Sequence, residues 1–399
     1  MIRKRPRTNH FLFCPGPVIV SKNVFTAVSR NIGHREEEFS ELLVSINKKL
    51  LCLFEIRDQS AYHPLLVTSS GTAANESVLS SVVGNKNVLI LANGEFGERL
   101  YGISKLHNRR TKLLHFGWGH PIDVKQVEAY IKKHKVDLLY MVHHETSIGI
   151  LNPAQEIGAI TKKYKLTFCL DAVSSVGADK IDLEAWNVSY CTTSAGKAIC
   201  SLPGLGIIMA RVKDLEKLKG VPAKTMYLNL YNLYKYSKEH MQTPNTPAVH
   251  LFYAIEQALI NIHKKGVVNL REDIRRRARL LRAGMKQMGL TFLIDEERMS
   301  ASLTTVILPS YITTTQLKLK LKEKNIVIYN GKGPLVDRVF QVANIGELSD
   351  VHIKMFLRSL KEALSKLEPT QARVEGHSMK VPMVLFPQLY LSKTYKRTA

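Results

Sequence analysis

Short runs of apolar residues alternate, along the first part of the chain, with longer segments in which apolar residues recur every three or four positions. The short runs predict buried strands over residues 65–68, 88–91, 138–142, 167–170 and 207–209. The longer segments predict helices over residues 72–83, 124–134 and 153–164. Strands that alternate with helices in this way are typical of βαβ units around a mostly parallel sheet.

A different pattern begins near residue 250. It predicts helices over residues 249–264, 269–288, 314–324 and 348–367, and strands over 303–308, 326–329 and 339–342. Elements in this order are typical of an α+β unit. We therefore predict four parts of the chain: an N-terminal arm (1–20), a large domain (21–250), a smaller C-terminal domain (251–368) and a basic C-terminal tail (369–399).

The composition excludes several classes of protein. The chain has 399 residues, of which 45% are hydrophobic and 23% are charged. This balance excludes a disordered chain, a collagen-like fibre and a disulfide-rich mini-protein. No apolar run approaches the roughly 20 residues that a membrane helix needs, so we predict no membrane partner.

The cysteines indicate the cellular compartment. Five occur, at positions 14, 52, 169, 191 and 200, and no two of them form a Cys-x-x-Cys pair. This predicts free thiols in a reducing compartment, with neither a disulfide framework nor a metal site. Pro15 and Pro17 interrupt the apolar run at residues 11–13 before a signal-peptide core could form. We therefore predict a cytoplasmic protein.

The net charge adds one clue about partners. Lys and Arg number 57 against 34 Asp and Glu, which gives a formal charge of +23. Such a surface attracts phosphates, acidic substrates or nucleic acid. Because the basic residues are spread along the chain, a Lys-rich proteome or charge hidden in interfaces is the favoured explanation of the excess. A nucleic-acid partner is therefore disfavoured.

Three segments carry candidate chemistry. Ser70-Gly71-Thr72 joins a predicted strand to a helix, where main-chain N–H groups can hold a phosphate, although the same residues also make an ordinary helix cap. Asp171 directly follows a buried strand, where a carboxylate can pair with a protonated ring nitrogen or simply cap a helix. Lys197 lies among small neutral residues, where a lysine can lose its proton and act as a nucleophile.

Together the three segments supply what pyridoxal phosphate needs: a phosphate cup, a carboxylate for the ring nitrogen and an amine for the aldehyde. At this point the chain resembles the class V aminotransferases of fold type I, over residues 11–367. Within that family it is most similar to the branch that acts on 2-aminoethylphosphonate and pyruvate. The resemblance implies an α/β fold in which a large domain holds a mostly parallel seven-stranded sheet, with a smaller C-terminal α+β domain. It also implies a homodimer with shared active sites.

The resemblance further implies the role of each matching residue. Lys197 would be the catalytic residue, Phe96 would stack on the cofactor ring, and Thr146 would lie near the ring hydroxyl. Thr243 and Thr246 would reach the phosphate of a neighbouring subunit. The full set implied to bind pyridoxal phosphate is Ser70, Gly71, Thr72, Phe96, Thr146, Asp171, Ser194, Lys197, Thr243 and Thr246.

Two departures from the family pattern concern the site. Gly196 precedes the lysine where relatives have Asn or Gln, so one cofactor hydrogen bond is missing or comes from Thr193 or Ser194. Gln341 stands where relatives have the Arg that binds the substrate carboxylate with two parallel hydrogen bonds.

The predicted substrate-binding residues reflect the second departure. They are Gly16, Gln341 and Lys332, which could contribute charge in place of the missing arginine.

The resulting functional hypothesis is an aminotransferase that moves an amino group from a small amine, 2-aminoethylphosphonate as the best guess, to a keto acid such as pyruvate. The neutral Gln341 leaves two alternatives open. One is an alanine– or serine–glyoxylate transaminase, and the other is a specialised lyase or epimerase with the same cofactor. A third hypothesis is an inactive scaffold that binds an acidic partner or nucleic acid through its charge.

Overall fold

A computed structural model of the protein describes residues 10–369 of the 399. Nine residues of the predicted arm and the predicted basic tail from residue 370 onward lie outside the described residues. Across residues 10–369, every helix is too short or too polar to cross a membrane.

The core of the molecule is a sheet of seven strands. In sheet order they are β2 (Tyr62–Thr68), β10 (Leu205–Arg211), β9 (Tyr190–Ser194), β8 (Thr167–Asp171), β5 (Leu138–Val142), β3 (Val88–Ala92) and β4 (Thr111–His115). Strand β10 runs antiparallel to both of its neighbours, and the other neighbouring pairs are parallel. The prediction of a mostly parallel seven-stranded sheet is confirmed.

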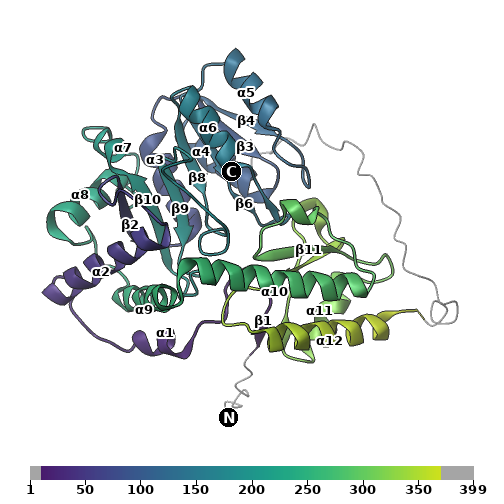
Figure 1. The fold of residues 1–399 in the computed structure, drawn as a ribbon. Coiled ribbons are helices and arrows are strands. Elements are labelled where there is room, and N and C mark those ends of the chain that lie inside the picture. Colours follow the sequence, from purple (N-terminus) through teal and green to yellow (C-terminus); the bar gives the residue numbers. More distant parts are fainter. Residues whose placement is uncertain (1–9, 370–399) are drawn as a thin grey trace, which may run out of the picture.

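Helices cover both faces of this sheet (Figure 1). One face packs against α2 (Glu37–Leu53), α5 (Val124–Lys133), α6 (Ala154–Lys163) and α9 (Val249–Lys265). The other face packs against α3 (Gly71–Val82), α4 (Glu95–His107), α7 (Val212–Glu216) and α8 (Leu230–His240). A parallel sheet needs helices on both faces because its crossover connections place them there.

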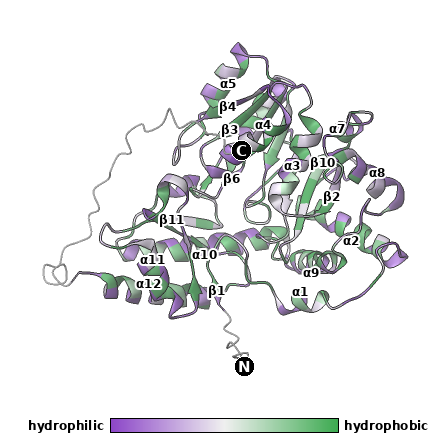
Figure 2. Ribbon diagram, turned by 180° about the vertical axis from the view of Figure 1, so that it is seen from behind, coloured by the Kyte–Doolittle hydropathy of each residue, from purple (hydrophilic) through white to green (hydrophobic). Residues whose placement is uncertain are grey.

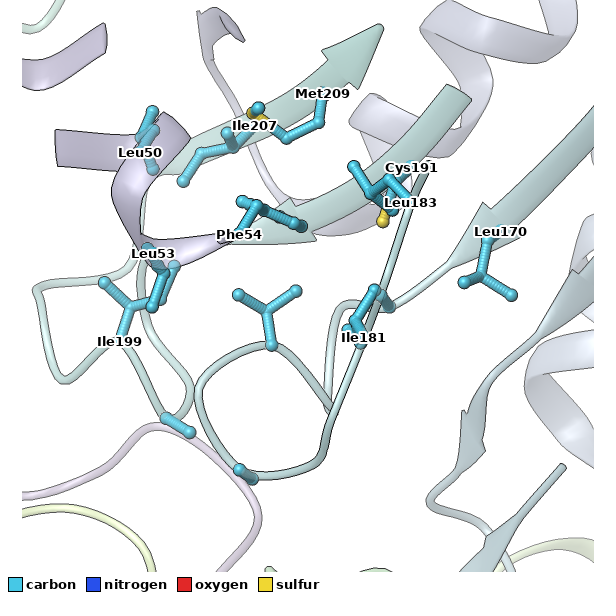
Figure 3. Close-up of a cluster of buried hydrophobic side chains, with 14 of the residues drawn as sticks. Leu50, Leu53, Phe54, Leu170, Ile181, Leu183, Cys191, Ile199, Ile207 and Met209 are labelled. Carbon is cyan, nitrogen blue, oxygen red and sulfur yellow. The ribbon is translucent and has the colours of Figure 1, made fainter. Parts of the chain in front are cut away.

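Strand β3 is apolar at every position for the same reason. Within β3, Leu89 and Leu91 point into one core while Val88 and Ile90 point into the other. Figure 2 accordingly shows the strands of the sheet mainly as hydrophobic and outer helices such as α5 as more hydrophilic. Figure 3 shows part of the first core, where Leu50 of α2 lies near Ile207 of β10.

A second unit follows in the chain. Its sheet has the order β11 (Leu303–Ile307), β14 (Val339–Ala343) and β13 (Tyr329–Asn330), and both pairs are antiparallel. Its helices are α10 (Val267–Gln287), α11 (Thr314–Lys322) and α12 (Asp350–Leu367), with 3-10 turns at Glu296–Arg298 and Gly333–Leu335. Helix α10 runs between the central sheet and α12 (Figures 1 and 2).

The N-terminal segment joins this second unit. Strand β1 (Phe11–Leu12) pairs in parallel with β12 (Ile326–Val327). The carbonyl of Phe13 then accepts a hydrogen bond from the N–H of Ala343 at 2.9 Å, and its ring packs against Phe356. Residues 14–17 are therefore held at the junction of the two units. Helix α1 (Lys22–Ala27) follows and packs on α9.

The structure refines two predictions. The strand predicted over 326–329 is two short strands, because residues 326–327 pair with β1 and residues 329–330 pair with β14. Helix α9, which begins at the predicted domain boundary, packs on α1 and α2 of the first unit as well as on α10. The boundary at residue 250 stays a prediction.

Candidate active site

Lys197 lies in the turn between β9 and β10. Its Nζ donates a hydrogen bond to the carbonyl of Pro15 at 2.8 Å. Burial lowers the pKa of this lysine; the charge of Lys332 lowers it further, while Cys14 and Asp171 raise it. A lysine whose pKa is lowered by burial provides more of the neutral, nucleophilic amine at neutral pH. The tight turn also accounts for Gly196, because a Cβ there would lie 3.0 Å from Cβ of Pro203.

Gly16 lies directly against the lysine. A Cβ at this position would lie 2.6 Å from Nζ of Lys197, and the φ angle of +141° disfavours any residue with a side chain. Only glycine therefore fits here without displacing the amine. The structure brings the predicted substrate residue Gly16 together with Lys197.

Asp171 ends β8 at the carboxyl edge of the sheet, and 5% of its surface is exposed. One carboxylate oxygen accepts the N–H of Val173 at 2.9 Å, and the other accepts the side-chain N–H of Asn75 at 2.6 Å. Burial raises the pKa of Asp171, whereas these two hydrogen bonds and the charges of Arg99 and Lys197 lower it. Burial is the largest of these effects, so the net pKa of Asp171 is raised, and the two hydrogen bonds offset part of the lost hydration of the carboxylate.

The predicted phosphate cup lies beside these groups. Ser70 caps α3, and its hydroxyl accepts the N–H of Ala73 at 3.4 Å. A Cβ on Gly71 would lie 2.7 Å from a methyl group of Val173 and 3.4 Å from Cβ of Ser194. The start of α3 therefore meets both the loop after Asp171 and the end of β9.

The side chains at this helix start remain available to a ligand. Ser70 and Thr72 are exposed. Strand alternation places Thr193 on the opposite face of β9 from Ser194, and the buried Thr193 hydroxyl has no hydrogen-bond partner among residues 10–369. Of the two candidates for the hydrogen bond missing at Gly196, Ser194 is the one that lies at the cup.

Phe96 is positioned by a buried carboxylate. Glu145 is the last residue of β6 (His144–Glu145), which pairs with β7 (Ile150–Leu151), and it accepts the N–H groups of Phe96 at 3.1 Å and Gly97 at 3.0 Å. These are unpaired donors at the start of α4, whose dipole also favours a negative charge there. A Cβ on Gly94 would collide with Ser147 and Glu145, so this glycine allows the close contact.

We predict a pH-dependent stability difference from Glu145. Burial raises the pKa of this carboxyl to about 7 from the ordinary glutamate value of 4.5. Between these two values the unfolded chain loses the proton before the folded protein does, so stability falls as the pH rises through about 7. The quantity to compare is the free energy of unfolding of the unsubstituted apoprotein minus that of Glu145→Gln. This difference should fall by up to about 3 kcal/mol as the pH rises from 5 to 8.

Urea unfolding at several pH values measures this difference. Burial lowers the pKa of His143 to about 3 and of His144 to about 4, but both histidines titrate in both proteins and cancel in the subtraction. A difference that does not change with pH would contradict the role given to Glu145.

The predicted substrate residues do not lie together in one group. Gln341 of β14 is 1% exposed, and its amide donates to the carbonyl of Thr146 at 2.5 Å and to the hydroxyl of Thr305 at 3.3 Å. It therefore fixes the β6–β7 loop that carries Thr146. The predicted contact of Thr146 with the cofactor stays a prediction.

Lys332 lies instead beside Phe96. Its Nζ is 4.6 Å from the centre of the Phe96 ring, and the Arg99 guanidinium carbon is 4.7 Å from the same centre. Glu95 accepts hydrogen bonds from both cations, at 3.2 Å from Lys332 and 2.6 Å from Arg99. Two cations and the carboxylate of Glu95 thus lie beside the ring, and the two cations can attract an anion.

The segment predicted to reach a neighbouring subunit is held in place by α2 and the residues before it. The guanidinium of Arg35 donates to the carbonyl of Thr243 at 2.9 Å, and Gln242 donates to Ser40 at 2.8 Å. Thr246 is exposed. The predicted contact of Thr243 and Thr246 with a second subunit stays a prediction.

Sequence analysis did not single out two residues of this site. Arg99 lies three positions after Phe96 on the same helix face, so the helical spacing could have indicated it. Asn75 lies one turn after the phosphate cup and gives no such signal, because its partners are distant in the sequence.

Comparison with known proteins decides the family. The model of the class-V aminotransferases matches residues 19–343. The chain belongs to the class-V aminotransferases.

Two relatives of this aminotransferase cover most of its length. An uncharacterized aminotransferase of Methanocaldococcus jannaschii is 32% identical over 89% of this chain and 93% of the relative. A 2-aminoethylphosphonate–pyruvate transaminase of Lysinibacillus sphaericus is 31% identical over 86% and 93%. The solved alanine–glyoxylate aminotransferase of Nostoc sp. has a TM-score of 0.86 at 24% identity, over 91% of this chain and 97% of that one, which shows the shared fold.

This aminotransferase is therefore a pyridoxal-phosphate-dependent transaminase of fold type I, as predicted. The residues present fit the cofactor. The start of α3 offers N–H groups and exposed hydroxyls to a phosphate, where Gly71 has no room for a side chain. The buried Asp171 and the lysine with lowered pKa stand next to it.

Proposed function

We propose that this aminotransferase moves the amino group of 2-aminoethylphosphonate to pyruvate. The pair of cations beside Phe96 carries the proposal, because both substrates are anions: the donor carries a phosphonate next to its reacting carbon, and pyruvate carries a carboxylate on its reacting carbon. Gln341 is neutral and supplies no charge for the donor phosphonate or the pyruvate carboxylate. Lys332 and Arg99 instead supply the positive charge, and relatives that share about 31% identity are named for this reaction.

We assign the roles of the chain as follows. The start of α3, with Ser70, Gly71 and Thr72, holds the cofactor phosphate. Asp171 pairs with the ring nitrogen and keeps it protonated. Lys197 holds the cofactor aldehyde until the substrate amine displaces it. When bound, pyridoxal phosphate draws electrons from the carbon that carries the substrate's amino group.

Lys197 then acts as the general base and acid. With the cofactor bound, the free Nζ of Lys197 would take the proton from the reacting carbon of the donor and would later donate a proton again. Gly16 leaves room for Nζ of Lys197 to move, because the Cβ of any other residue at position 16 would lie 2.6 Å from Nζ. The second half of the cycle repeats these proton movements in reverse with pyruvate as the acceptor.

The proposal includes a homodimer and a cytoplasmic location. Thr243 and Thr246 are proposed to complete the phosphate site of a neighbouring subunit, which the restraint by Arg35 supports. The five cysteines are free thiols, as a reducing compartment requires.

The visible absorbance of the holoprotein tests the donor. 2-Aminoethylphosphonate should bleach the band of the lysine-bound cofactor, and pyruvate should restore it. Bleaching by L-alanine with none by the phosphonate would favour the alanine–glyoxylate type of reaction. A band unaffected by either compound would exclude the proposed donor.

Replacing Lys332 with methionine tests the anion site. We expect KM for 2-aminoethylphosphonate to rise about tenfold, since a charge-assisted contact is lost. The pKa of Lys197 should also rise, because Lys332 lowers it in the unsubstituted protein. Lys354→Met, on exposed α12, is the matched control and should change neither value. An unchanged KM in Lys332→Met would place the phosphonate elsewhere.

A further inference from the structure

Asp171 has a buried side-chain partner that the proposed reaction does not use. Asn75 lies on α3 one turn after Gly71, and 5% of its surface is exposed. Its side-chain N–H donates to Asp171 Oδ2 at 2.6 Å. The other carboxylate oxygen accepts the N–H of Val173. Each oxygen of Asp171 therefore has a fixed donor, and the plane of the carboxylate is set.

Two hydroxyls fix the orientation of the Asn75 amide. The Tyr140 hydroxyl donates to Asn75 Oδ1 at 2.7 Å, and the Thr192 hydroxyl donates to the same oxygen. A flipped amide would turn its oxygen toward a carboxylate oxygen of Asp171, which is repulsive. The amide nitrogen therefore has one stable direction.

The strands explain why these groups meet. Tyr140 is on β5 and Thr192 is on β9, which are the two neighbours of β8, the strand that ends in Asp171. Thr192 stands directly beside Asp171 in the register. The three strands present their polar side chains on the face covered by α3, among the apolar residues Ala74 and Val78. The network is buried and continuous from the sheet to the helix.

Because the network is buried, its hydrogen bonds affect the ionisation of Asp171. A buried carboxylate loses the hydration that favours its ionised form, and hydrogen bonds from neutral donors restore part of that support. Asn75 provides such a donor without adding a charge of its own. A carboxylate that is ionised and fixed in direction is what a protonated ring nitrogen needs as a partner.

We propose that Asn75 is a positioning residue, which keeps Asp171 ionised and directed at the ring nitrogen of pyridoxal phosphate, with Tyr140 and Thr192 fixing its amide. The proposal rests on the pairing of Asp171 with the ring nitrogen given under the proposed function. It is independent of the amino donor, so a different donor leaves it unchanged.

Binding of two cofactors to the apoprotein tests it. The first is pyridoxal phosphate, and the second is its 1-deaza analogue, in which a carbon replaces the ring nitrogen. Asn75→Ala should weaken the binding of pyridoxal phosphate about tenfold, since a hydrogen bond to a charged group is lost. Binding of the analogue should change less than about twofold, because it has no nitrogen for Asp171 to hold.

A buried asparagine elsewhere provides the control. The amide of Asn344 donates to the carbonyls of Ile274 and Ala301 in the second unit. Asn344→Ala should weaken both cofactors equally or neither. An equal loss of both cofactors in Asn75→Ala would show a purely structural role and overturn the proposal. If the unsubstituted protein binds pyridoxal phosphate no more tightly than the analogue, the role of Asp171 itself is refuted.

A milder variant keeps the test decisive if Asn75→Ala does not fold. Tyr140→Phe removes one hydroxyl from the Asn75 oxygen and leaves the aromatic ring in the core. It should reduce the preference for pyridoxal phosphate over the analogue by about twofold to fivefold. An unchanged preference in this variant would overturn the proposed role of the network.

Discussion

Replacing Lys197 with alanine is expected to abolish transamination. The variant loses both the covalent attachment of the cofactor and the general base, so kcat should fall by at least about 10⁴-fold. No second amine can take over, because the nearest lysine named at the site, Lys332, is held by Glu95 beside the Phe96 ring. Steady-state rates with 2-aminoethylphosphonate and pyruvate measure the loss.

Two further measurements separate lost chemistry from lost folding. Lys180→Ala changes an exposed lysine and should keep full activity. Added methylamine should restore part of the activity of Lys197→Ala, since the space left near Gly16 can admit a small amine. A Lys197→Ala protein that turns over at the original rate would refute the assignment of the active site.

Local sequence patterns predicted the apolar strands inside the sheet, but not β9, which contains Thr192 and Thr193. The strand over residues 138–142 was found because a parallel strand between two helical layers is apolar throughout. Strand β4, which sequence analysis did not identify, lies at the edge of the sheet, and Lys112 and His115 in it are exposed. The pairing of β1 with β12 was also not predictable, because two residues on each side give too short a signal across three hundred positions.

The same limit applies to the site. Asp171 and Lys197 could be found because each follows a recognisable strand or lies in an unusual small-residue turn, and their combination is specific. Asn75 could not be found, since an asparagine inside a helix looks like any polar position until Tyr140 and Thr192 arrive from two other strands. Catalytic residues that belong to local motifs can be predicted from the sequence. Residues that position them from other strands can be identified only in the folded structure.

Replacing Asp171 with asparagine should cost about 10²- to 10³-fold in kcat while preserving the shape of the side chain. The variant lacks the negative charge that keeps the ring nitrogen protonated. The carboxylate accepts hydrogen bonds from Asn75 and Val173. The amide of the variant would turn an N–H group towards one of these two donors, so that this hydrogen bond is lost. We expect KM to change much less than kcat, because the proposed site for the anionic group of the substrate is at Lys332 and Arg99.

Asp179 offers a matched control for this loss. It is a second buried aspartate, and its carboxylate accepts the Ser300 hydroxyl at 2.6 Å and the N–H of Ala301 at 3.1 Å. Asp179→Asn should lower stability without a selective fall in kcat, since its contacts join the two units and do not reach the lysine.

The 1-deaza cofactor makes the prediction specific to the ring nitrogen. With this cofactor the unsubstituted enzyme should already be slow, and Asp171→Asn should slow it little further, because charge and nitrogen act as one pair. If the substitution instead costs the same factor with both cofactors, Asp171 acts through the fold of the site and not through the ring nitrogen.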